Sequence, residues 1–270
     1  MIINFCKYQG TGNDFIIIDD RDLWFPIANT KIIAQLCDRR FGIGADGLIL
    51  LQPHAELDFY MKYYNADGNE SSMCGNGGRC IAAFAKHIGL VTETTKFMAI
   101  DGAHDALIQS INGAHPYVKL KMKSVGKIES RDDNTFVLNT GSPHYVQYLS
   151  NSINDLAIEP QAHAVRYNDE FASEGINVNF ANVLQEGSIT MRTYERGVED
   201  ETLSCGTGVT AAAIALALVK KLPTGNYTIA VTTVGGQLKV SFDYNEIETN
   251  FSNIWLQGPA TFVYEGNVEV

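Results

Sequence analysis

Short apolar runs separated by turn signals dominate the hydrophobic pattern of this chain. Residues 15–19 (FIIID) and 48–51 (LILL) are almost continuously apolar, which is typical of buried strands. In residues 119–123 (KLKMK) apolar and polar positions alternate, which predicts a half-exposed strand. The runs at 189–194 and 229–233 look similar. Most of the chain is therefore expected to form short strands.

Helical spacing is confined to three segments. Residues 30–40 place their apolar side chains on one face, and Gly42 lies just past the expected end. Residues 80–88 (CIAAFAKHI) and 209–221 (VTAAAIALALVKK) are apolar nearly all round, which predicts buried helices. Residues 234–237 (VGGQ) join two strand-like runs and predict a hairpin turn.

The two buried helices follow similar sequences in the two halves of the chain. MCGNGGR leads into the first and SCGTG into the second, so Cys74 and Cys205 each stand in a Cys-Gly-polar-Gly segment. A stretch containing acidic residues precedes each cysteine. This weak internal repeat predicts two similar domains that meet at a cleft. Their boundary is expected near residues 113–116, where an Asn-Gly turn and a proline interrupt the strands.

Composition narrows the possible partners. The chain has 270 residues and a net charge of −11, from 31 acidic and 20 basic residues. This balance argues against a nucleic-acid binder or a protein of anionic membrane surfaces, which would need a basic surface. It leaves room for an anionic substrate, because a site can be locally positive. No apolar run is long enough to span a membrane, and the N-terminus lacks a signal-peptide layout, so a cytoplasmic protein is expected.

The five cysteines argue for thiol chemistry and against a structural framework. An odd number in an unexported chain disfavours disulfides, and no C-x-x-C pair is present to form a structural zinc site. A cysteine before a buried helix is most often a small packing residue, and this remains the default for Cys6, Cys37 and Cys80. The matched surroundings of Cys74 and Cys205 favour a functional role for that pair.

A cysteine at a helix N-terminus can be an acid or a base next to an anion site. Unpaired N–H groups and the helix dipole favour the thiolate there, and the same N–H groups can hold a carboxylate. Two such helix ends would offer two bases to one bound carboxylate. That arrangement suits inversion at the carbon next to the carboxylate, where one thiolate removes the α-proton and the other thiol returns one.

The motifs around these cysteines resemble those of the diaminopimelate epimerase family, pyridoxal-independent enzymes that interconvert LL- and meso-diaminopimelate. The resemblance runs from near the start of the chain to its C-terminal end. The motifs that carry it are 9–15 (QGTGNDF), 42–47 (GIGADG), 64–68 (YNADG), 73–79 (MCGNGGR), 141–144 (GSPH) and 194–208 (YERGVEDETLSCGTG).

The resemblance implies an α+β fold of two similar domains. Each would be a curved, mostly antiparallel β-sheet or barrel around a central buried α-helix, with the active site in the cleft between them. The domains would cover residues 1–116, completed by a C-terminal strand in 261–270, and residues 117–260. The family also implies a homodimer, no cofactor and no metal, a small-molecule substrate, and a place in lysine and peptidoglycan precursor biosynthesis.

The resemblance also assigns roles to single residues. Cys74 and Cys205 would be the acid/base pair, and His144 and Glu195 would adjust their protonation. Four backbone amides would hold the α-carboxylate, and four side chains would bind the distal amino-acid end of the substrate. The implied substrate-binding residues are Asn13, Asn65, Gly75, Asn76, Asn177, Glu195, Arg196, Gly206 and Thr207. One departure is Ser142, where the family pattern carries asparagine.

Two alternatives stay open. A proline or hydroxyproline racemase of the same fold would use the same two thiols, although such enzymes typically carry histidine where this chain has Asn76. They also need no residues for a distal zwitterion. A non-catalytic thiol-redox or ligand-binding protein would use low-pKa cysteines without proton transfer.

Overall fold

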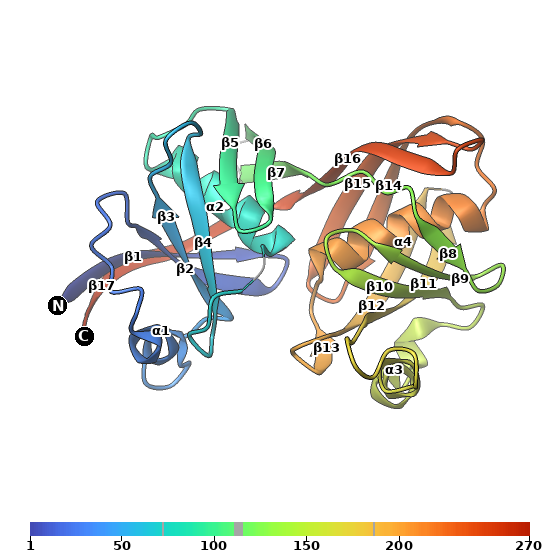
Figure 1. Cartoon of the computed structure of the whole chain (residues 1–270), viewed down its shortest axis with the longest axis horizontal. Helices are drawn as coiled ribbons and strands as arrows, with labels where there is room; N and C mark the ends of the chain where they lie inside the picture. The colour runs from blue at the N-terminus through green and yellow to red at the C-terminus, as the bar shows by residue number, and fades with distance from the viewer. Residues whose placement is uncertain (72, 111–115, 186) are drawn as a thin grey trace. The chain divides into compact units, whose positions relative to one another are not determined.

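The computed structural model describes residues 1–71, 73–110, 116–185 and 187–270 (Figure 1). The chain divides into two compact units. The first unit comprises Met1–Leu120 and Gly258–Val270, and the second comprises Lys121–Gln257. The Asn-Gly turn expected at the boundary lies outside the described residues. Both units are built mainly of strands with few helices, which confirms the predicted α+β class.

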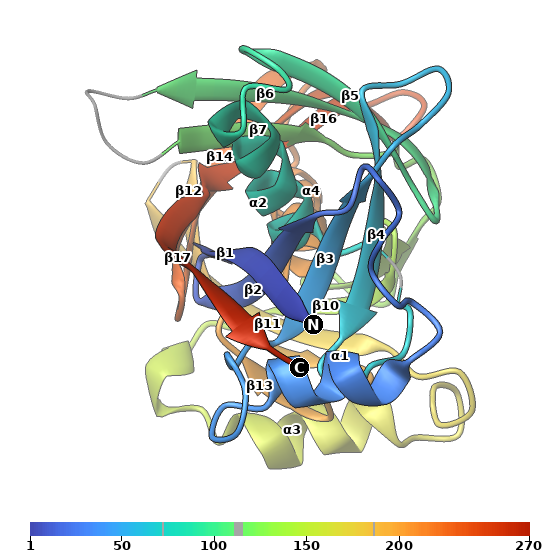
Figure 2. The same ribbon diagram turned by 90° about the vertical axis from the view of Figure 1, so that its left-hand side faces the viewer.

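The first unit is a mixed β-sheet that contacts the helix α2 (Gly75–His87) through β1, β2, β3 and β6 (Figure 2). The strands are paired in the order β17-β1-β2-β3-β4-β5-β6-β7. The pairs β2–β3 and β4–β5 are parallel, and the other pairs in this series are antiparallel. The strands are β1 (Ile2–Gly10), β2 (Asn13–Asp19), β3 (Gly47–Gln52), β4 (Phe59–Asn65), β5 (Thr94–Ala99), β6 (Gly102–Ser110), β7 (Pro116–Lys121) and β17 (Thr261–Glu269).

The strands β2 and β3 are buried on both faces, as their continuous apolar runs predict. On one face, Ile16 and Leu48 pack in a cluster with Ile33 of α1 (Thr30–Cys37). On the other face, Phe15 and Ile49 lie against the first turn of α2, within 3.5 Å of where a Cβ on Gly77 would stand. Helices on both faces therefore explain why neither run alternates with polar residues.

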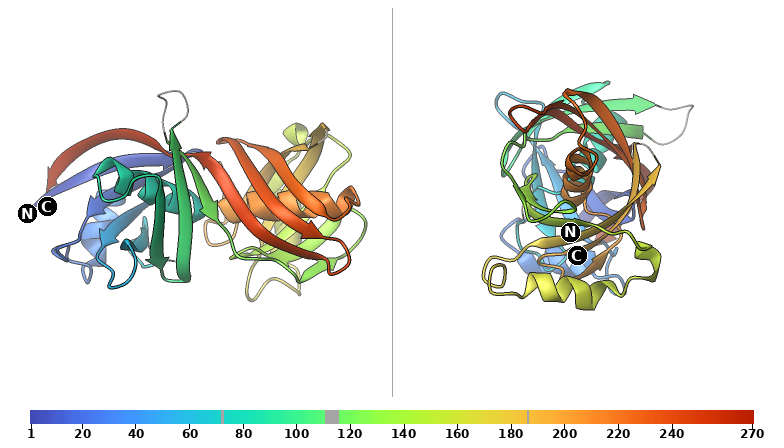
Figure 3. Two further views of the ribbon diagram at one scale, coloured as in Figure 1. Left: turned by 90° about the horizontal axis from the view of Figure 1, so that it is seen from above. Right: turned by 90° about the vertical axis from the view of Figure 1, so that its right-hand side faces the viewer.

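The two ends of the chain meet in the first unit. The strand β17 pairs with β1 in antiparallel register, from Ile2 opposite Glu269 to Gln9 opposite Thr261. The N-terminal ammonium donates a hydrogen bond of 2.6 Å to the carbonyl of Val270. Figures 2 and 3 show the termini side by side.

The second unit repeats this pattern of pairing around α4 (Gly206–Val219). Its strands are paired in the order β8-β9-β10-β11-β12-β14-β15-β16, with β10–β11 and β12–β14 parallel and the other pairs antiparallel. The short β13 pairs with the end of β12. The strands are β8 (Ile128–Ser130), β9 (Thr135–Asn139), β10 (Pro143–Tyr148), β11 (Asn177–Gln185), β12 (Ser188–Glu195), β13 (Asp200–Thr202), β14 (Gly225–Thr233), β15 (Gly236–Asn245) and β16 (Asn250–Pro259).

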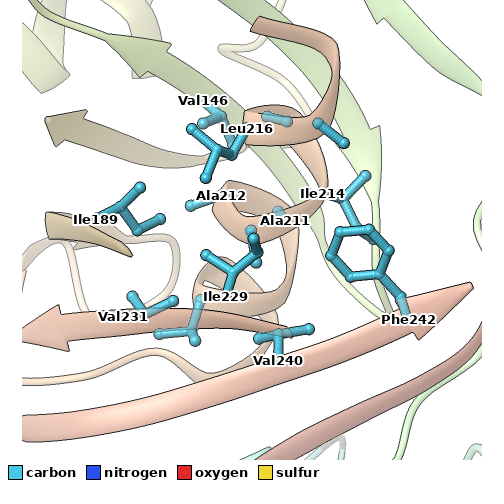
Figure 4. Close-up of a cluster of buried hydrophobic side chains, with 14 of the residues drawn as sticks. Val146, Ile189, Ala211, Ala212, Ile214, Leu216, Ile229, Val231, Val240 and Phe242 are labelled. Atoms are coloured by element: carbon cyan, nitrogen blue, oxygen red, sulfur yellow. The ribbon is translucent and has the colours of Figure 1, made fainter. Parts of the chain in front are cut away.

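The helix α4 forms the core of the second unit because it is apolar on every side. Strands β9 to β12, β14 and β15 contact it, and Figure 3 shows the helix together with the strands of this unit. Figure 4 shows Ile229, Val231 and Val240 on one side of the helix and Val146 and Ile189 on another. The many alanines of the helix leave room for branched side chains from the surrounding strands.

The helix limits differ from those predicted. The helices α2 and α4 begin at Gly75 and Gly206, five and three residues before the predicted starts, because the glycine-rich turns are themselves helical. They end at His87 and Val219, slightly before the predicted ends. The strand predicted at 119–123 ends at Lys121.

The helix α1 ends at Cys37 instead of residue 40. Asp38 adopts an extended backbone there, and its carboxylate accepts hydrogen bonds of 2.7 Å from the N–H groups of Arg40 and Phe41. One helix was not predicted, namely α3 (Ile158–Arg166), which follows a 3-10 turn at Ile153–Asp155. Only Ile158 and Ala162 of α3 are buried, so its apolar periodicity is weak. None of the described helices is long and apolar enough to cross a membrane.

We expect the substitution Ile214→Ala in α4 to lower the free energy of unfolding by about 3 kcal/mol, because it leaves a cavity in a closely packed core. Ile214 is fully buried, whereas Ile247 in the same unit is 93% exposed and provides the matched control. Urea unfolding should show a change within about 0.5 kcal/mol for Ile247→Ala. Equal losses for both variants would contradict the central role of α4.

Candidate active site

Cys74 and Cys205 occupy the same position in the two units. Each is the residue that precedes the first turn of a buried helix, with extended backbone angles of φ −99° and ψ 126° for Cys74 and φ −110° and ψ 112° for Cys205. Each carbonyl accepts a 2.8 Å hydrogen bond from the residue four positions on, Gly78 or Val209. Neither sulfur caps its helix. The thiols therefore stand beside first-turn N–H groups that have no acceptor within the helix.

In each unit, the predicted binding residues lie at the ends of neighbouring strands. Asn13 begins β2, and Asn65 ends β4 opposite the first residue of β3, Gly47. In the second unit, His144 at the start of β10 pairs with Asn177 at the start of β11, and Glu195 ends the neighbouring strand β12. The alternation of parallel and antiparallel pairs brings these strand ends together.

The Cys74 site contains two of the predicted asparagines in direct contact. Asn13 Oδ1 accepts hydrogen bonds from Cys74 Sγ and from Asn76 Nδ2, both at 3.4 Å. The Asn13 amide nitrogen donates to Asp46 Oδ2 at 2.5 Å. Since an amide oxygen can only accept, the Cys74 sulfur is the donor of its bond, as a thiol. Asp46 was not among the predicted site residues, although it lies within the motif 42–47.

The Cys205 site contains a short hydrogen-bonded chain. Cys205 Sγ lies 3.4 Å from Thr207 Oγ1, which lies 2.8 Å from His144 Nε2. The other ring nitrogen of His144, Nδ1, is 3.1 Å from the amide nitrogen of Asn179. The structure therefore connects His144 to Cys205 through the side chain of Thr207.

The orientation of Asn179 settles the tautomer of His144. The Asn179 amide nitrogen also donates to the carbonyl of Tyr145 at 3.0 Å, and its oxygen accepts from Thr193 Oγ1 at 3.0 Å. Since the nitrogen is thereby the atom facing His144, Nδ1 of the ring must accept. His144 then carries its proton on Nε2 and donates to Thr207, whose own hydroxyl hydrogen can be donated to the Cys205 sulfur.

Burial keeps His144 neutral. The ring is fully buried, and this burial, together with the charge of Arg196, lowers the pKa of His144 to about 3. Gly208 is needed for this packing, because a Cβ there would stand 2.5 Å from Asn179 Oδ1.

Asn179 is a site residue that sequence reasoning missed. It is a fully buried polar residue in the strand β11, and it lies two positions from the predicted Asn177. A buried strand residue with four hydrogen-bonding positions needs specific partners. In the sequence, Asn177, Asn179 and Asn182 all interrupt the apolar residues of this segment, so nothing singles out Asn179.

Asn177 and Arg196 are held by each other. Asn177 Oδ1 accepts from the backbone N–H of Arg196 at 2.9 Å, and its nitrogen donates to Ser142 Oγ at 2.9 Å and to the carbonyl of Pro143 at 3.0 Å. The exposed Arg196 side chain donates to the carbonyl of Glu174. Within the described ranges it forms no ion pair, so its charge is available to a carboxylate.

The remaining predicted residues are Asn65 and Glu195. Asn65 is exposed, and its side chain has no hydrogen bond to the described part of the chain. Glu195 is half-buried at the end of β12 and pairs through its backbone with Asp200.

Three further cysteines carry no such features. Burial raises the pKa values of Cys37 and Cys80 to about 12 and that of Cys6, with help from Glu265, to about 11. These residues are thiols at neutral pH, as packing residues would be. Among the described residues no group of three or more His, Cys, Asp or Glu side chains is placed to hold a metal ion.

The depressed pKa of His144 predicts a pH-dependent loss of stability. Below the ordinary histidine pKa near 6.5, the unfolded chain binds a proton that the folded chain does not. The free energy of unfolding therefore decreases as the pH is lowered below this value. When the pH is lowered from 7 to 5, the free energy of unfolding of the native protein, measured with urea, should decrease by about 2 kcal/mol more than that of the variant His144→Gln. Parallel pH profiles of the two proteins would contradict a neutral, buried His144.

Comparison with known proteins agrees with this geometry. The family model for diaminopimelate epimerase matches residues 5–123 and 136–263. The diaminopimelate epimerase of Flavobacterium psychrophilum is 50% identical over 262 residues, which cover 97% of this chain and 98% of that protein. That of Chlorobaculum tepidum is 38% identical and covers 96% of this chain and 99% of its own length.

Solved structures share the fold at low identity. A PhzF-family phenazine biosynthesis protein from Bacillus anthracis has a TM-score of 0.78 at 15% identity, with both chains fully covered. A hydroxyproline epimerase from Agrobacterium vitis has a TM-score of 0.69 at 14% identity and covers 99% of this chain and 91% of its own. These structures agree with the α+β architecture. The family match and the relatives aligned almost from end to end establish that the chain belongs to the diaminopimelate epimerase family.

Proposed function

We propose that this isomerase interconverts LL-2,6-diaminopimelate and meso-2,6-diaminopimelate, with Cys74 and Cys205 as its two acid/base groups. The observation that carries the proposal is the matched placement of both cysteines before the first turn of a buried helix. Each of these helix ends lies in its own unit with the side chains that the resemblance assigns to the substrate.

The reaction requires one thiolate and one thiol. The thiolate removes the α-proton and becomes a thiol, and the electron pair of the broken C–H bond spreads into the neighbouring carboxylate. The other thiol gives a proton to the opposite face of the carbon and becomes a thiolate. Protons and charge balance, and the reverse reaction exchanges the two roles. The pair titrates as a coupled system, with one charge shared between two sulfurs.

The helix ends stabilise the charge that develops. In our proposal the first-turn N–H groups of Gly75, Asn76, Gly206 and Thr207 hold the α-carboxylate, where they meet the extra negative charge of the carbanion. Asn13, Asn65, Asn177 and Arg196 bind the distal end of the substrate. Arg196 suits the distal carboxylate because its planar fork can bind both oxygens.

His144 and Glu195 adjust the protonation of the thiols in this proposal. His144 acts as a neutral donor through Thr207, so that the hydroxyl of Thr207 can donate to the Cys205 thiolate. A hydrogen bond to a thiolate stabilises the charged form. The same hydroxyl can accept when Cys205 is protonated, so it serves both states of the sulfur.

We also propose that the enzyme is cytoplasmic and works as a homodimer. The family resemblance supports both points. The product serves lysine and peptidoglycan precursor synthesis.

Proline-type substrates remain the competing proposal, since a hydroxyproline epimerase shares the fold. Incubation with LL-diaminopimelate in heavy water, under reducing conditions, should give meso product with deuterium at one α-carbon. Mass spectrometry and chiral separation measure both at once. Exchange into proline or hydroxyproline, with none into diaminopimelate, would reverse the assignment.

Either substitution, Cys74→Ala or Cys205→Ala, should abolish epimerisation, because one face of the α-carbon then lacks its acid or base. The control is Cys6→Ala, which removes a half-buried thiol with a raised pKa and should retain full activity. Substantial turnover by either active-site variant would refute the two-thiol mechanism.

The variant Thr207→Val should lower kcat by about tenfold, because it breaks the hydrogen-bonded link between His144 and Cys205 but keeps the backbone N–H. Thr207→Ser restores the hydroxyl and should recover most of the activity. Steady-state kinetics distinguish the two outcomes. A valine variant as active as the serine variant would exclude the link through Thr207.

A further inference from the structure

A fully buried arginine lies beneath the Cys74 site, and the proposed mechanism does not use it. Arg79 belongs to α2 and has no exposed surface. Its guanidinium donates to the carbonyl of Gly75 at 3.3 Å, to Thr11 Oγ1 at 3.2 Å and to Asn76 Oδ1 at 3.0 Å. Its Nε has no hydrogen-bond partner, and no carboxylate of the described residues forms an ion pair with it.

A buried cation without a carboxylate is costly, and proteins rarely keep one without use. Burial lowers the pKa of Arg79, and the charges that oppose this are those of ionised Cys80, Cys74 and Tyr117. Burial holds Cys80 as a thiol, with a pKa of about 12, and also raises the pKa of Tyr117. Cys74 is therefore the one of these three groups that the proposed reaction itself converts to an anion.

Arg79 also fixes the direction of a chain of side-chain amides. Because a guanidinium only donates, Asn76 must turn its oxygen to Arg79 and its nitrogen to Asn13. At the other end, the carboxylate of Asp46 only accepts, so Asn13 must turn its nitrogen to Asp46. Arg79 and Asp46 therefore impose the same orientation on the two amides between them, and this orientation leaves Asn13 Oδ1 facing Cys74 Sγ.

The neighbouring backbone leaves room for this side chain. A Cβ on Gly10 at the end of β1 would stand 3.2 Å from Arg79 Nη2 and 3.3 Å from both Asn76 O and Cys80 Sγ, tighter than ordinary contact. Glycine at position 10 therefore lets β1 pass close to the buried guanidinium.

The second unit lacks the cation at the equivalent position. Five residues after Cys205 stands Thr210, whose hydroxyl donates to the carbonyl of Gly206 at 3.0 Å. Arg79, five residues after Cys74, makes the corresponding bond to the carbonyl of Gly75. Both units therefore have a side chain that donates to the carbonyl of the first helical residue. Of the two side chains, only Arg79 is charged and also donates to a side-chain amide, that of Asn76.

We propose that Arg79 is a positioning residue of the Cys74 site, which fixes the amides of Asn76 and Asn13 toward the sulfur and offsets the negative charge of the Cys74 thiolate. The proposal rests on the acid/base role of Cys74 and the binding role of Asn13 given above. It assigns Asp46 the complementary role of orienting Asn13 from the opposite end.

The test follows alkylation of single cysteines by iodoacetamide as a function of pH, with mass spectrometry of the labelled peptides. Arg79→Met removes both the positive charge and the planar guanidinium with its N–H donors. Arg79→Lys keeps the positive charge but loses the planar guanidinium. Cys205 in the same molecule is the internal control, and Arg21→Met makes the same change at an exposed arginine paired with Asp19.

In Arg79→Met, the pH at which alkylation of Cys74 is half-maximal should rise by about one unit, and the corresponding pH for Cys205 should not change. The kcat of this variant should fall about tenfold. Arg79→Lys should recover most of the Cys74 midpoint, but KM for diaminopimelate should remain several-fold raised, because one ammonium cannot replace the planar fork. Arg21→Met should match the native protein in every measurement.

A native Cys74 midpoint together with native kcat and KM in Arg79→Met would overturn the proposal. If that variant fails to fold, Arg79→Lys decides: native KM and kcat overturn the proposal, and a raised KM with a native Cys74 midpoint supports it. Failure of the proposed function would look different, since diaminopimelate would then not protect Cys74 of the native protein from alkylation.

Discussion

The constraint on which each unit depends is the burial of a helix whose first turn cannot satisfy its own N–H groups. Inside a sheet, those groups have little access to water and need an acceptor. Both units have the same local arrangement, with a cysteine in extended conformation before the helix, no cap from its sulfur, and small residues in the first turn. The result is a donor-rich site beside a sulfur, which suits the anionic ligand of the proposed function.

The strand order follows from the same constraint. An alternation of parallel and antiparallel pairs lets the sheet of each unit contact its helix along several strands and brings strand ends to the helix N-terminus. In the first unit these ends provide Asn13 and Asn65, and in the second His144, Asn177 and Glu195. Buried apolar contacts with the alanine-rich helix of the second unit hold this arrangement, so that the side chains proposed to bind substrate extend from rigid elements.

The surroundings of the two sulfurs differ although their backbones match. Cys74 donates to an amide oxygen and has a buried cation beneath its helix turn, whereas Cys205 lies beside a hydroxyl that a neutral histidine orients. In the proposed mechanism the two sulfurs exchange the roles of acid and base, and different partners suit this exchange because each sulfur then needs stabilisation in both of its forms. The repeat therefore conserves the helix end and varies the side chains behind it.

The sequence by itself determined the family, the α+β class, the main strands and the matched position of two cysteines before buried helices, because these depend on local features: hydrophobic period, turn residues and contiguous motifs. It placed the starts of α2 and α4 too late, since glycine has poor helix propensity and only burial against the sheets makes those turns helical. It missed α3, whose helical period is weak. It also missed the contacts of Arg79, Asp46 and Asn179. Each has a partner at least 33 positions away along the chain, and only the tertiary structure brings these donors and acceptors together.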